Sequence, residues 1–223
     1  TKAQAEAELI AHNGKDANIL KTVHLDMKVG CRPEFWVGNC IAIGLSGGFI
    51  EPLESTGLHI INIGARLLAT HLSSKDVVQD VRDSYNRLMN GAYQDLKQFI
   101  VLHYCLTDRD DTEFWQQAQR SVNHCPELKR NLAVWQHKVC EYFDLAGGYS
   151  TTFTDENYRF ILYGMQHYPK LNLNICHQQS DTVFEKLARK GIHTVNQTLS
   201  HQEFLQGLHD MPLAEIAKMW AEH

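Results

Sequence analysis

The stretch GNCIAIGLSGGFIEPLESTG, residues 38–57, decides the fold because it joins an apolar run to a helix through a glycine-rich turn. Residues 38–45 predict a short strand buried on both faces, as in α/β proteins. Gly44, Gly47 and Gly48 carry no Cβ, so the backbone can approach a ligand closely there. Apolar side chains then recur at helical spacing at Leu58, Ile60, Ile61, Leu67 and Leu68. The stretch therefore predicts a strand, a ligand-binding turn and a helix.

The helix after this turn is expected to begin just past Ser55 or Thr56, since either residue is a suitable N-cap. Amides of the first helical turn have no intrahelical partner and lie at the positive end of the helix dipole. Such an end can bind an anion. From spacing alone, helix capping is the commoner use of Glu54, Ser55 and Thr56, and an anion or catalytic site is the alternative.

Length and composition describe a globular chain. Its 223 residues fit one domain or two small ones, and 43% apolar content is enough for a core. A formal net charge of -5 argues against nucleic acid or an anionic membrane surface as partner. Neither a signal peptide nor an apolar run of about 20 residues is present, so a cytoplasmic location is expected.

Cysteine and histidine usage points to neither disulfides nor a metal. The six cysteines are scattered without a Cys-x-x-Cys pair, and we expect reduced thiols. None of the thirteen histidines lies in a His-Glu-x-x-His array or beside a cysteine at zinc-finger spacing. No metal site is predicted.

Two strands and several helices are expected along the chain. Residues 22–29 alternate apolar and polar side chains, which predicts a half-buried strand. A second strand is expected at 34–45, after a turn near Gly30 and Pro33. The first twelve residues favour helix, and apolar spacing over 78–106 predicts one long amphipathic helix. Further helices are predicted at 112–120, 128–143, 155–166, 182–190 and 212–220, with loops at 146–150 and 171–174.

This arrangement is unusual for a complete nucleotide-binding enzyme. A sheet of two strands cannot bury itself or form a nucleotide site alone. The Gly-x-Gly-x-x-Gly turn that cradles a dinucleotide pyrophosphate does not occur in the chain. We therefore expect the chain to be part of a larger protein.

Three motifs resemble the flavin-dependent tryptophan halogenase family. GFIEPLESTG at residues 48–57 is similar to that family's signature, HYCLTDRDDTEFW at 103–115 to a second stretch, and DENYRFILYGM at 155–165 to a third. In the family, the flavin glycine motif, a Trp-x-Trp-x-Ile-Pro motif and a catalytic lysine lie far N-terminal to the signature. The resemblance therefore implies a C-terminal part of a two-part FAD enzyme.

The resemblance also implies a fold class and a division of the chain. Residues 1–57 would be the C-terminal portion of an α/β flavin-monooxygenase-like domain with few strands, which binds FAD and substrate. Residues 58–223 would form a mainly α-helical C-terminal region.

The chemistry that the resemblance implies is halogenation of an electron-rich aromatic ring. Reduced FAD, supplied by a separate flavin reductase, forms a flavin hydroperoxide that chloride or bromide attacks to give hypohalous acid. Glu54 would be the catalytic carboxylate beside the substrate, and Ser55 would lie between flavin and substrate. The amides of Thr56 and Gly57 would hold the halide.

Cofactor and substrate contacts follow from the same resemblance. Backbone contacts with FAD would come from Gly44, Gly47, Gly48 and Pro52, although the glycines could instead serve only a tight turn. Candidate substrate residues are Phe153, Asn157 and Tyr158, whose alternative role is a helix start with a core aromatic. The loop GGYSTTFTDENY at 147–158 has glycine where the family's amino-acid-binding glutamate aligns. Another indole, a phenol or a pyrrole is thus an alternative to tryptophan.

Two other functions stay open. One is a flavin monooxygenase or oxidoreductase without halogenation, and the other is a non-enzymatic helical interaction module. The expected partners are an aromatic small molecule, an N-terminal flavin-binding portion and a flavin reductase, with no nucleic acid and no membrane. A homodimer is left open. Alone, the chain is expected to lack activity and to bind no FAD tightly.

Overall fold

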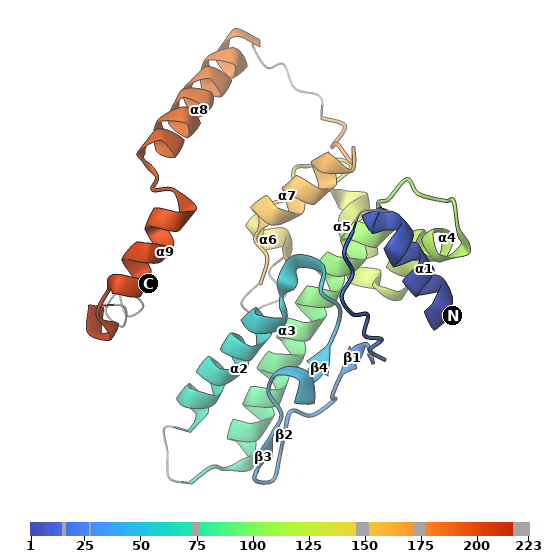
Figure 1. Ribbon diagram of the computed structural model, residues 1–223, viewed down its shortest axis with the longest axis vertical. Helices are drawn as coiled ribbons and strands as arrows, with labels where there is room; N and C mark the ends of the chain where they lie inside the picture. Colours follow the sequence, from blue (N-terminus) through green and yellow to red (C-terminus); the bar gives the residue numbers. More distant parts are fainter. Residues whose placement is uncertain (15–16, 27, 73–75, 146–151, 172–176, 216–223) are drawn as a thin grey trace. The chain divides into compact units, whose positions relative to one another are not determined.

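The computed structural model describes residues 1–14, 17–26, 28–72, 76–145, 152–171 and 177–215 (Figure 1). The chain divides into two compact units, residues 1–171 and 172–223. Both residues 1–57 and residues 58–171 belong to the first unit. The domain boundary expected at residue 57 concerns a longer protein and stays a prediction.

Helix α3, Gln79–Cys105, is the centre of the first unit. Its apolar residues recur at helical spacing, so one long face is buried, as predicted for 78–106. The N-terminal half contacts α2, Gly57–His71, and the strand β2, Trp36–Val37. The C-terminal half contacts α4, Glu113–Arg120. Figure 1 shows α2 running beside α3.

Helix α3 contributes side chains to two different cores. In the first, Phe35, Trp36 and Ile60 pack with Tyr85, Met89, Ala92, Tyr93, Leu96 and Ile100 of α3. In the second, Phe99 and Leu102 of α3 pack with Cys125, Leu128, Trp135, Cys140, Tyr158 and Leu162. One rigid helix therefore connects the glycine-rich turn to the helical region that follows it.

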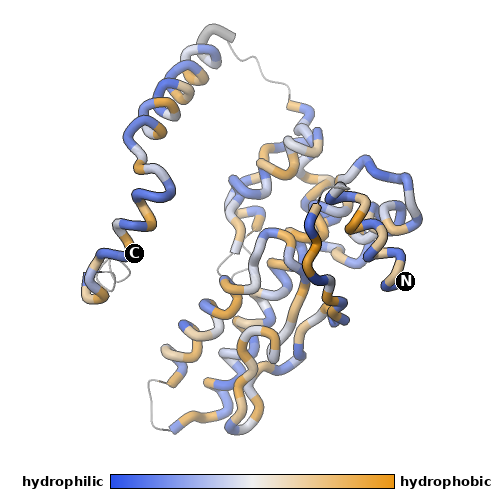
Figure 2. The backbone as a smooth tube through the Cα atoms, viewed as in Figure 1, coloured by the Kyte–Doolittle hydropathy of each residue, from blue (hydrophilic) through white to orange (hydrophobic). Residues whose placement is uncertain are grey.

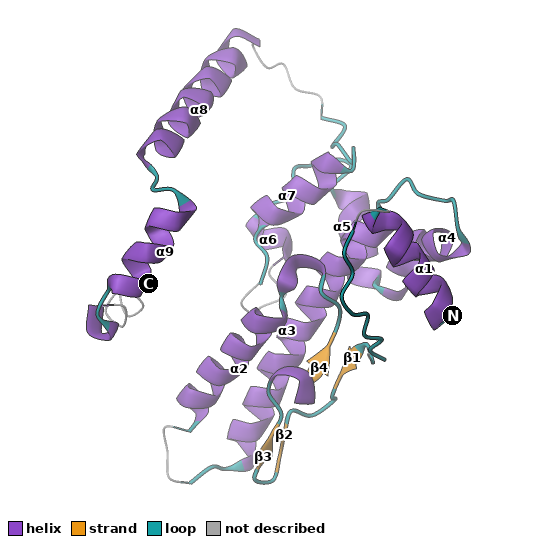
Figure 3. Cartoon of the chain, in the orientation of Figure 1, coloured by secondary structure: helices purple, strands orange, loops and turns teal. Residues whose placement is uncertain are grey.

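The described strands are short and form two antiparallel pairs. Strand β1, Gly30–Cys31, pairs with β4, Gly48–Phe49, in the register Gly30 to Phe49. Strand β2 pairs with β3, Cys40–Ile41, across a turn in which Gly38 has a φ of 58°. Figure 3 shows these strands gathered near α2 and α3, whereas the rest of the unit consists of helices and loops.

The predicted continuous strand at 34–45 is wrong, because the chain reverses there into the β2–β3 hairpin. Burial on both faces is also wrong, since Cys40 is exposed and Leu45 is 81% exposed. The hairpin is fixed by α3: Asn86 Oδ1 accepts hydrogen bonds from the amides of Phe35 at 2.8 Å and Trp36 at 2.7 Å. This long-range contact outweighs the strand-like pattern of the local sequence.

The predicted strand at 22–29 is also wrong: its described residues have no regular secondary structure. The side chains meant for the buried face are exposed, by 65% at Val23 and 72% at Leu25. Apolar alternation gives a strand a buried face only where a partner strand is available. Among the described strands, none pairs with this segment.

Most helices follow the sequence pattern. Helix α1, Lys2–Asn13, is confirmed, and so are α4, capped by Thr112, and α7, Asp155–Gly164. The predicted helix at 128–143 is instead two shorter ones, α5, Pro126–Val134, and α6, Tyr142–Leu145. The chain turns between them because Asp144 Oδ2 accepts from the Glu141 amide at 2.9 Å and from Trp135 Nε1 at 3.1 Å.

The second unit contains helices α8, His177–Gln197, and α9, His201–Asp210. The first is longer than the predicted 182–190. Figure 2 shows apolar and polar residues alternating along α8, as in an amphipathic helix. Of the predicted helix at 212–220, residues up to 215 are described; the loop at 146–150 and residues 172–174 of the second loop lie outside the described residues.

Two further observations bear on the class of protein. Within the described residues, no helix is long and apolar enough to span a membrane. Cys31, Cys40, Cys105, Cys125 and Cys140 all carry free thiols. Burial raises the pKa of the Cys140 thiol to about 12, so it remains neutral.

Candidate active site

The signature turn between β4 and α2 contains two consecutive strained residues. A 3₁₀ turn, Leu53–Ser55, leads into α2, and within it Glu54 has φ 64° and ψ 6° while Ser55 has φ 52°. Left-handed conformations at residues other than glycine are uncommon and cost on the order of 1–3 kcal/mol each. Such strain is concentrated at ligand-binding and catalytic sites, so this turn is a candidate functional site.

The start of α2 presents free backbone donors. Thr56 occupies the N-cap position and is 5% exposed, but its side chain makes no capping hydrogen bond. The first helical bond runs from the Ile60 amide to the Thr56 carbonyl at 3.0 Å. The amides at 57–59 therefore have no helical carbonyl to bind, as at any helix start. Of the two N-caps proposed from the sequence, Thr56 holds the position.

A small cavity lies against this helix start. Its volume is about 40 Å³, and Gly44, Gly48, Thr56 and Gly57 are among the residues that line it. A cavity of this size holds one water molecule or an ion of similar size. It does not hold a flavin. The structure thus brings four of the predicted cofactor and halide residues around one ion-sized space.

The glycines of the turn have roles within the fold itself. Gly44 has a φ of 64°. A Cβ on Gly48 would lie 2.7 Å from Cys31 Cβ, which the β1–β4 pairing excludes. A Cβ on Gly47 would lie 3.0 Å from the Phe35 ring. Each glycine is required by the tight turn, and their contact with FAD, like that of the exposed Pro52, stays a prediction.

Glu54 is held by a histidine that the sequence reasoning did not select. Its Oε1 lies 3.1 Å from Nε2 of His103, in the last turn of α3. The other ring nitrogen, Nδ1, lies 2.8 Å from the Phe99 carbonyl oxygen. The His103 side chain is 13% exposed and that of Glu54 is 37% exposed. The sequence feature that could have identified His103 is the motif HYCLTDRDDTEFW, which begins at this residue.

The predicted substrate residues lie beside the same part of α3. Phe153 stacks on Phe99 with ring centroids 3.7 Å apart, and Tyr158 meets Phe99 at 4.9 Å. Phe99 also packs edge-on against His103 at 4.8 Å. Contacts therefore run without a gap from Glu54 through His103 and Phe99 to Phe153 and Tyr158. The sequence reasoning missed both linking residues.

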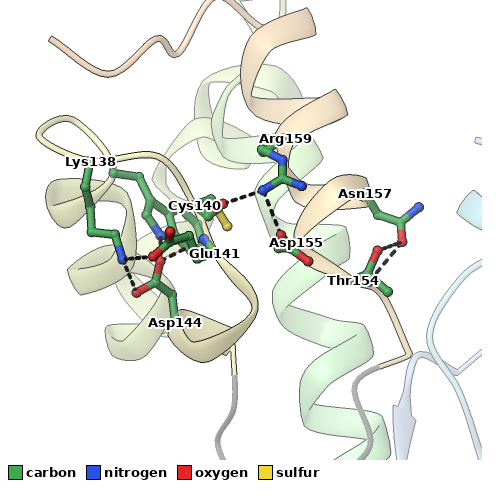
Figure 4. A network of polar contacts seen from close by, with 9 residues as sticks. Lys138, Cys140, Glu141, Asp144, Thr154, Asp155, Asn157 and Arg159 are labelled. Carbon is green, nitrogen blue, oxygen red and sulfur yellow. Dashed lines mark hydrogen bonds and ion pairs between the residues drawn. The ribbon is translucent and has the colours of Figure 1, made fainter. Parts of the chain in front are cut away.

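The third predicted substrate residue, Asn157, has a partner within its own helix. Its Oδ1 accepts from the Thr154 amide at 2.9 Å and from the Thr154 hydroxyl at 3.0 Å, so it closes the first turn of α7 (Figure 4). This is a helix-capping contact. Tyr158 is fully packed, and burial raises its pKa. A role for either side chain in substrate binding stays a prediction.

Polar contacts fix the start of α7 against the preceding helices, as Figure 4 shows. From α7, Arg159 reaches the Cys140 carbonyl oxygen at 2.9 Å and Asp155 at 2.7 Å. Asp95 of α3 accepts from the Thr152 amide at 2.6 Å. Burial raises the pKa of Asp95, and its hydrogen bonds with Thr152 and Phe153 oppose that rise. These contacts hold Phe153 in place on Phe99.

A larger cavity of about 610 Å³ shares Ile50, Glu51 and Tyr93 with the small one. Glu51, Tyr93, Lys97, Tyr104 and Phe114 are among the residues around it. The Tyr104 hydroxyl donates to Glu51 Oε1 at 3.0 Å, and burial together with this contact raises the pKa of Tyr104. In the part of the chain that the structure describes, no group of three or more histidine, cysteine or acidic side chains could hold a metal.

Comparison with known proteins places this geometry in a family. The family model for tryptophan halogenase matches residues 1–181. The chain belongs to the tryptophan halogenase family. The membership predicted from the three motifs is therefore confirmed, and the family is flavin-dependent.

Individual halogenases align with parts of the chain. Tryptophan 6-halogenase SttH of Streptomyces toxytricini is 35% identical over 116 residues, which are 52% of this chain and 22% of that protein. 7-chloro-L-tryptophan 6-halogenase KtzR of Kutzneria sp. (strain 744) is 35% identical over 137 residues, 61% of this chain and 26% of that protein.

Solved halogenase structures share the fold. The crystal structure of SttH matches with a TM-score of 0.80 at 25% identity and covers 92% of this chain. Tar14, a tryptophan C-6 flavin-dependent halogenase from taromycin biosynthesis, matches with a TM-score of 0.79 at 26% identity and covers 94%. The chain spans 41% and 42% of these two proteins. A halogenase fold with few strands and many helices is thus shown.

Proposed function

We propose that the chain is the C-terminal part of an FAD-dependent halogenase that acts on an electron-rich aromatic ring, such as tryptophan, an indole or a related compound. The observation that carries the proposal is the continuous contact from Glu54, in its strained turn, to Phe153 and Tyr158 through His103 and Phe99. A carboxylate and an aromatic surface are what a site for aromatic substitution needs side by side.

The cofactor and halide would meet at the signature turn. Gly44, Gly47, Gly48 and Pro52 would contact FAD through their backbone, and the Thr56 and Gly57 amides would hold chloride or bromide. The ion-sized cavity at the start of α2 supports the halide assignment. It is too small for a flavin, and the chain has no glycine turn for the pyrophosphate, so the FAD site would include residues of the N-terminal portion. When bound and reduced, FAD would activate molecular oxygen, which is the oxidant that turns halide into an electrophilic halogen.

Glu54 would act on the substrate side. A carboxylate near a halogenated ring stabilises the cationic intermediate and accepts the ring proton, after which the ring is aromatic again. Ser55, next to it in the turn, would lie on the path of the halogen species. Phe153, Asn157 and Tyr158 would border the substrate, with Phe153 as the stacking surface.

The remaining parts of the proposal concern the whole protein. An N-terminal portion would supply the flavin glycine motif and the catalytic lysine, and a separate reductase would supply reduced FAD in the cytoplasm. The division into an α/β portion at 1–57 and a helical region at 58–223 belongs to that larger protein. Support comes from relatives of which the chain spans less than half.

The test is Glu54→Gln in a protein that also carries the flavin-binding portion. We expect product formation at saturating substrate to fall at least 100-fold, the scale of a lost proton acceptor, while FAD affinity stays unchanged. Mass spectrometry identifies the product as halogenated or oxygenated and so distinguishes halogenation from plain oxygenation.

The matched control is Glu127→Gln, an exposed carboxylate that accepts a hydrogen bond from Gln98 at 3.2 Å. It should leave the halogenation rate unchanged. Full product formation by Glu54→Gln would mean that Glu54 only shapes the turn. Oxygenated product alone from the wild-type protein would mean that the enzyme is a monooxygenase and not a halogenase.

A further inference from the structure

The two nitrogens of His103 face two different acceptors. Nδ1 lies 2.8 Å from the Phe99 carbonyl oxygen, which can only accept a hydrogen bond, so Nδ1 carries a proton. Nε2 lies 3.1 Å from Glu54 Oε1. An ionised carboxylate also only accepts, and a neutral imidazole has one proton to give. The second contact is therefore a hydrogen bond only if the pair holds one more proton.

That proton has two places to reside. Either His103 is an imidazolium that donates to an ionised Glu54, or Glu54 is a carboxylic acid that donates to Nε2. In both states the two side chains hold one proton between Nε2 and Oε1, and in the imidazolium–carboxylate state the contact is charge-assisted. A charge-assisted bond is stronger and more directional than a neutral one.

We propose that His103 positions Glu54 by sharing a proton between its own Nε2 and Oε1 of the Glu54 carboxyl group. This rests on the proposed function, in which Glu54 acts at the reacting ring. The shared proton occupies Oε1 and thereby leaves Oε2 to face the substrate.

The surroundings of His103 suit a positioning role. Its ring is fixed at one end by the Phe99 carbonyl and along one edge by the Phe99 ring, 4.8 Å away at 85°. Phe99 is itself covered by Phe153 and Tyr158. Glu54, by contrast, is on a strained turn and is partly exposed. A rigid histidine thus fixes a carboxylate whose own backbone does not fix it.

The proton balance of the reaction is simple under this arrangement. As the C–H bond of the halogenated ring breaks, its electron pair returns to the ring, and its proton passes to Oε2 of Glu54 while the shared proton resides on Nε2 of His103. The halogen comes from the oxidised halide of the proposed activity. His103 keeps its Nδ1 proton throughout and donates it in a hydrogen bond to the Phe99 carbonyl oxygen. The partly exposed carboxyl group of Glu54 releases the ring proton to water.

His71 provides a matched internal reference. Its Nδ1 also faces the carbonyl oxygen four residues earlier, Leu67, at 2.7 Å, and its ring packs edge-on against Tyr85 at 5.8 Å. Its Nε2, however, faces the Ser84 hydroxyl at 3.3 Å, which can donate. The two histidines differ in the group opposite Nε2, a carboxyl for His103 and a hydroxyl for His71.

The first test is nitrogen-15 NMR of the histidine rings in the 223-residue chain at neutral pH. We expect His71 to be the neutral tautomer protonated at Nδ1, and His103 to show Nδ1 protonated with a proton also on or bridging Nε2. In Glu54→Gln, His103 should become the neutral Nδ1-protonated form, as His71 is. A neutral His103 protonated only at Nε2, or a spectrum unchanged by Glu54→Gln, would overturn the proposal. This test requires no halogenation.

The second test uses two variants of the flavin-bearing protein. His103→Gln keeps a donor near the position of Nε2, whereas His103→Asn keeps one near Nδ1 and loses the contact with Glu54. We expect His103→Asn to lower product formation at saturating substrate about tenfold and His103→Gln to restore most of it. Equal losses in both variants, or no loss in either, would mean that the ring only packs. A wild-type protein that fails to halogenate would refute the proposed function, and the NMR result would still decide the proton sharing.

Discussion

Residues 35–57 and residues 17–29 each overlap a predicted strand, yet they fold differently. The first segment is held to α3 at several points: Asn86 binds the backbone of Phe35 and Trp36, Arg82 Nε binds the Gly38 carbonyl at 3.1 Å, and Tyr93 binds that of Gly48 at 3.1 Å. The described residues of the second have no regular secondary structure, with Val23, Leu25 and Val29 exposed. Residues 17–29 contact α1 through Thr22 and His24 instead, so buried polar contacts with α3, more than local pattern, decide which segment forms a hairpin.

Asn86→Ala is the substitution expected to destabilise the chain most. The change leaves the buried amides of Phe35 and Trp36 and the Trp36 carbonyl, bound by Nδ2 at 3.1 Å, without a partner. Each orphaned group costs about 1–3 kcal/mol, so the free energy of unfolding should fall by about 3–5 kcal/mol. Urea denaturation of the chain, followed by tryptophan fluorescence, measures it.

Asn90→Ala is the control for this change, one turn further along α3. Asn90 Nδ2 donates to the carbonyls of Pro33 at 3.0 Å and Asn86 at 2.9 Å in a less buried position. Its loss should cost about 1 kcal/mol. Similar losses in the two variants would mean that Asn86 is not the main anchor of the hairpin.

Tyr93→Phe tests a second, weaker anchor. Phenylalanine keeps the stacking on Phe35 at 5.2 Å and loses only the bond to the Gly48 carbonyl, so stability at neutral pH should fall by about 1 kcal/mol. Burial is the main cause that raises the pKa of Tyr93 to about 12 in the folded state, above the ordinary value near 10.

The Tyr93 contribution therefore depends on alkaline pH. Because the unfolded chain ionises first, this contribution is intact below pH of about 10 and is lost as the pH rises toward 12. Subtracting the Tyr93→Phe unfolding curve from the wild-type curve at each pH removes the effect of the other tyrosines. A difference that stays constant from pH 9 to about 12 would contradict the assigned cause.

The sequence predicted those parts of the fold and site that depend on local spacing. Helices α3 and α4 and the start of α2 at Thr56 follow from residues that are close in the chain. The hairpin and the role of Asn86 depend on residues about 50 positions apart. His103 likewise meets Glu54 across 49 residues, so no local pattern reveals it. The motif resemblance, which carries tertiary information, named Glu54 and Phe153 but not the residues that join them.

The smallest effect is expected in residues 17–29, whose side-chain contacts with α1, such as Thr22 with Glu6 and Lys2 with Asp26, do not involve Leu25. Leu25→Ala removes a side chain that is 72% exposed, so the free energy of unfolding of the chain should change by less than about 0.5 kcal/mol. Leu67→Ala is the matched comparison: this leucine of α2 is half-buried against the first core and should cost about 1–2 kcal/mol, below the range for a fully buried leucine. Urea unfolding of both variants gives the difference directly. A loss above about 1 kcal/mol for Leu25→Ala would show that the segment packs against the first unit, and would mean that the apolar alternation of residues 22–29 does bury a face within this chain.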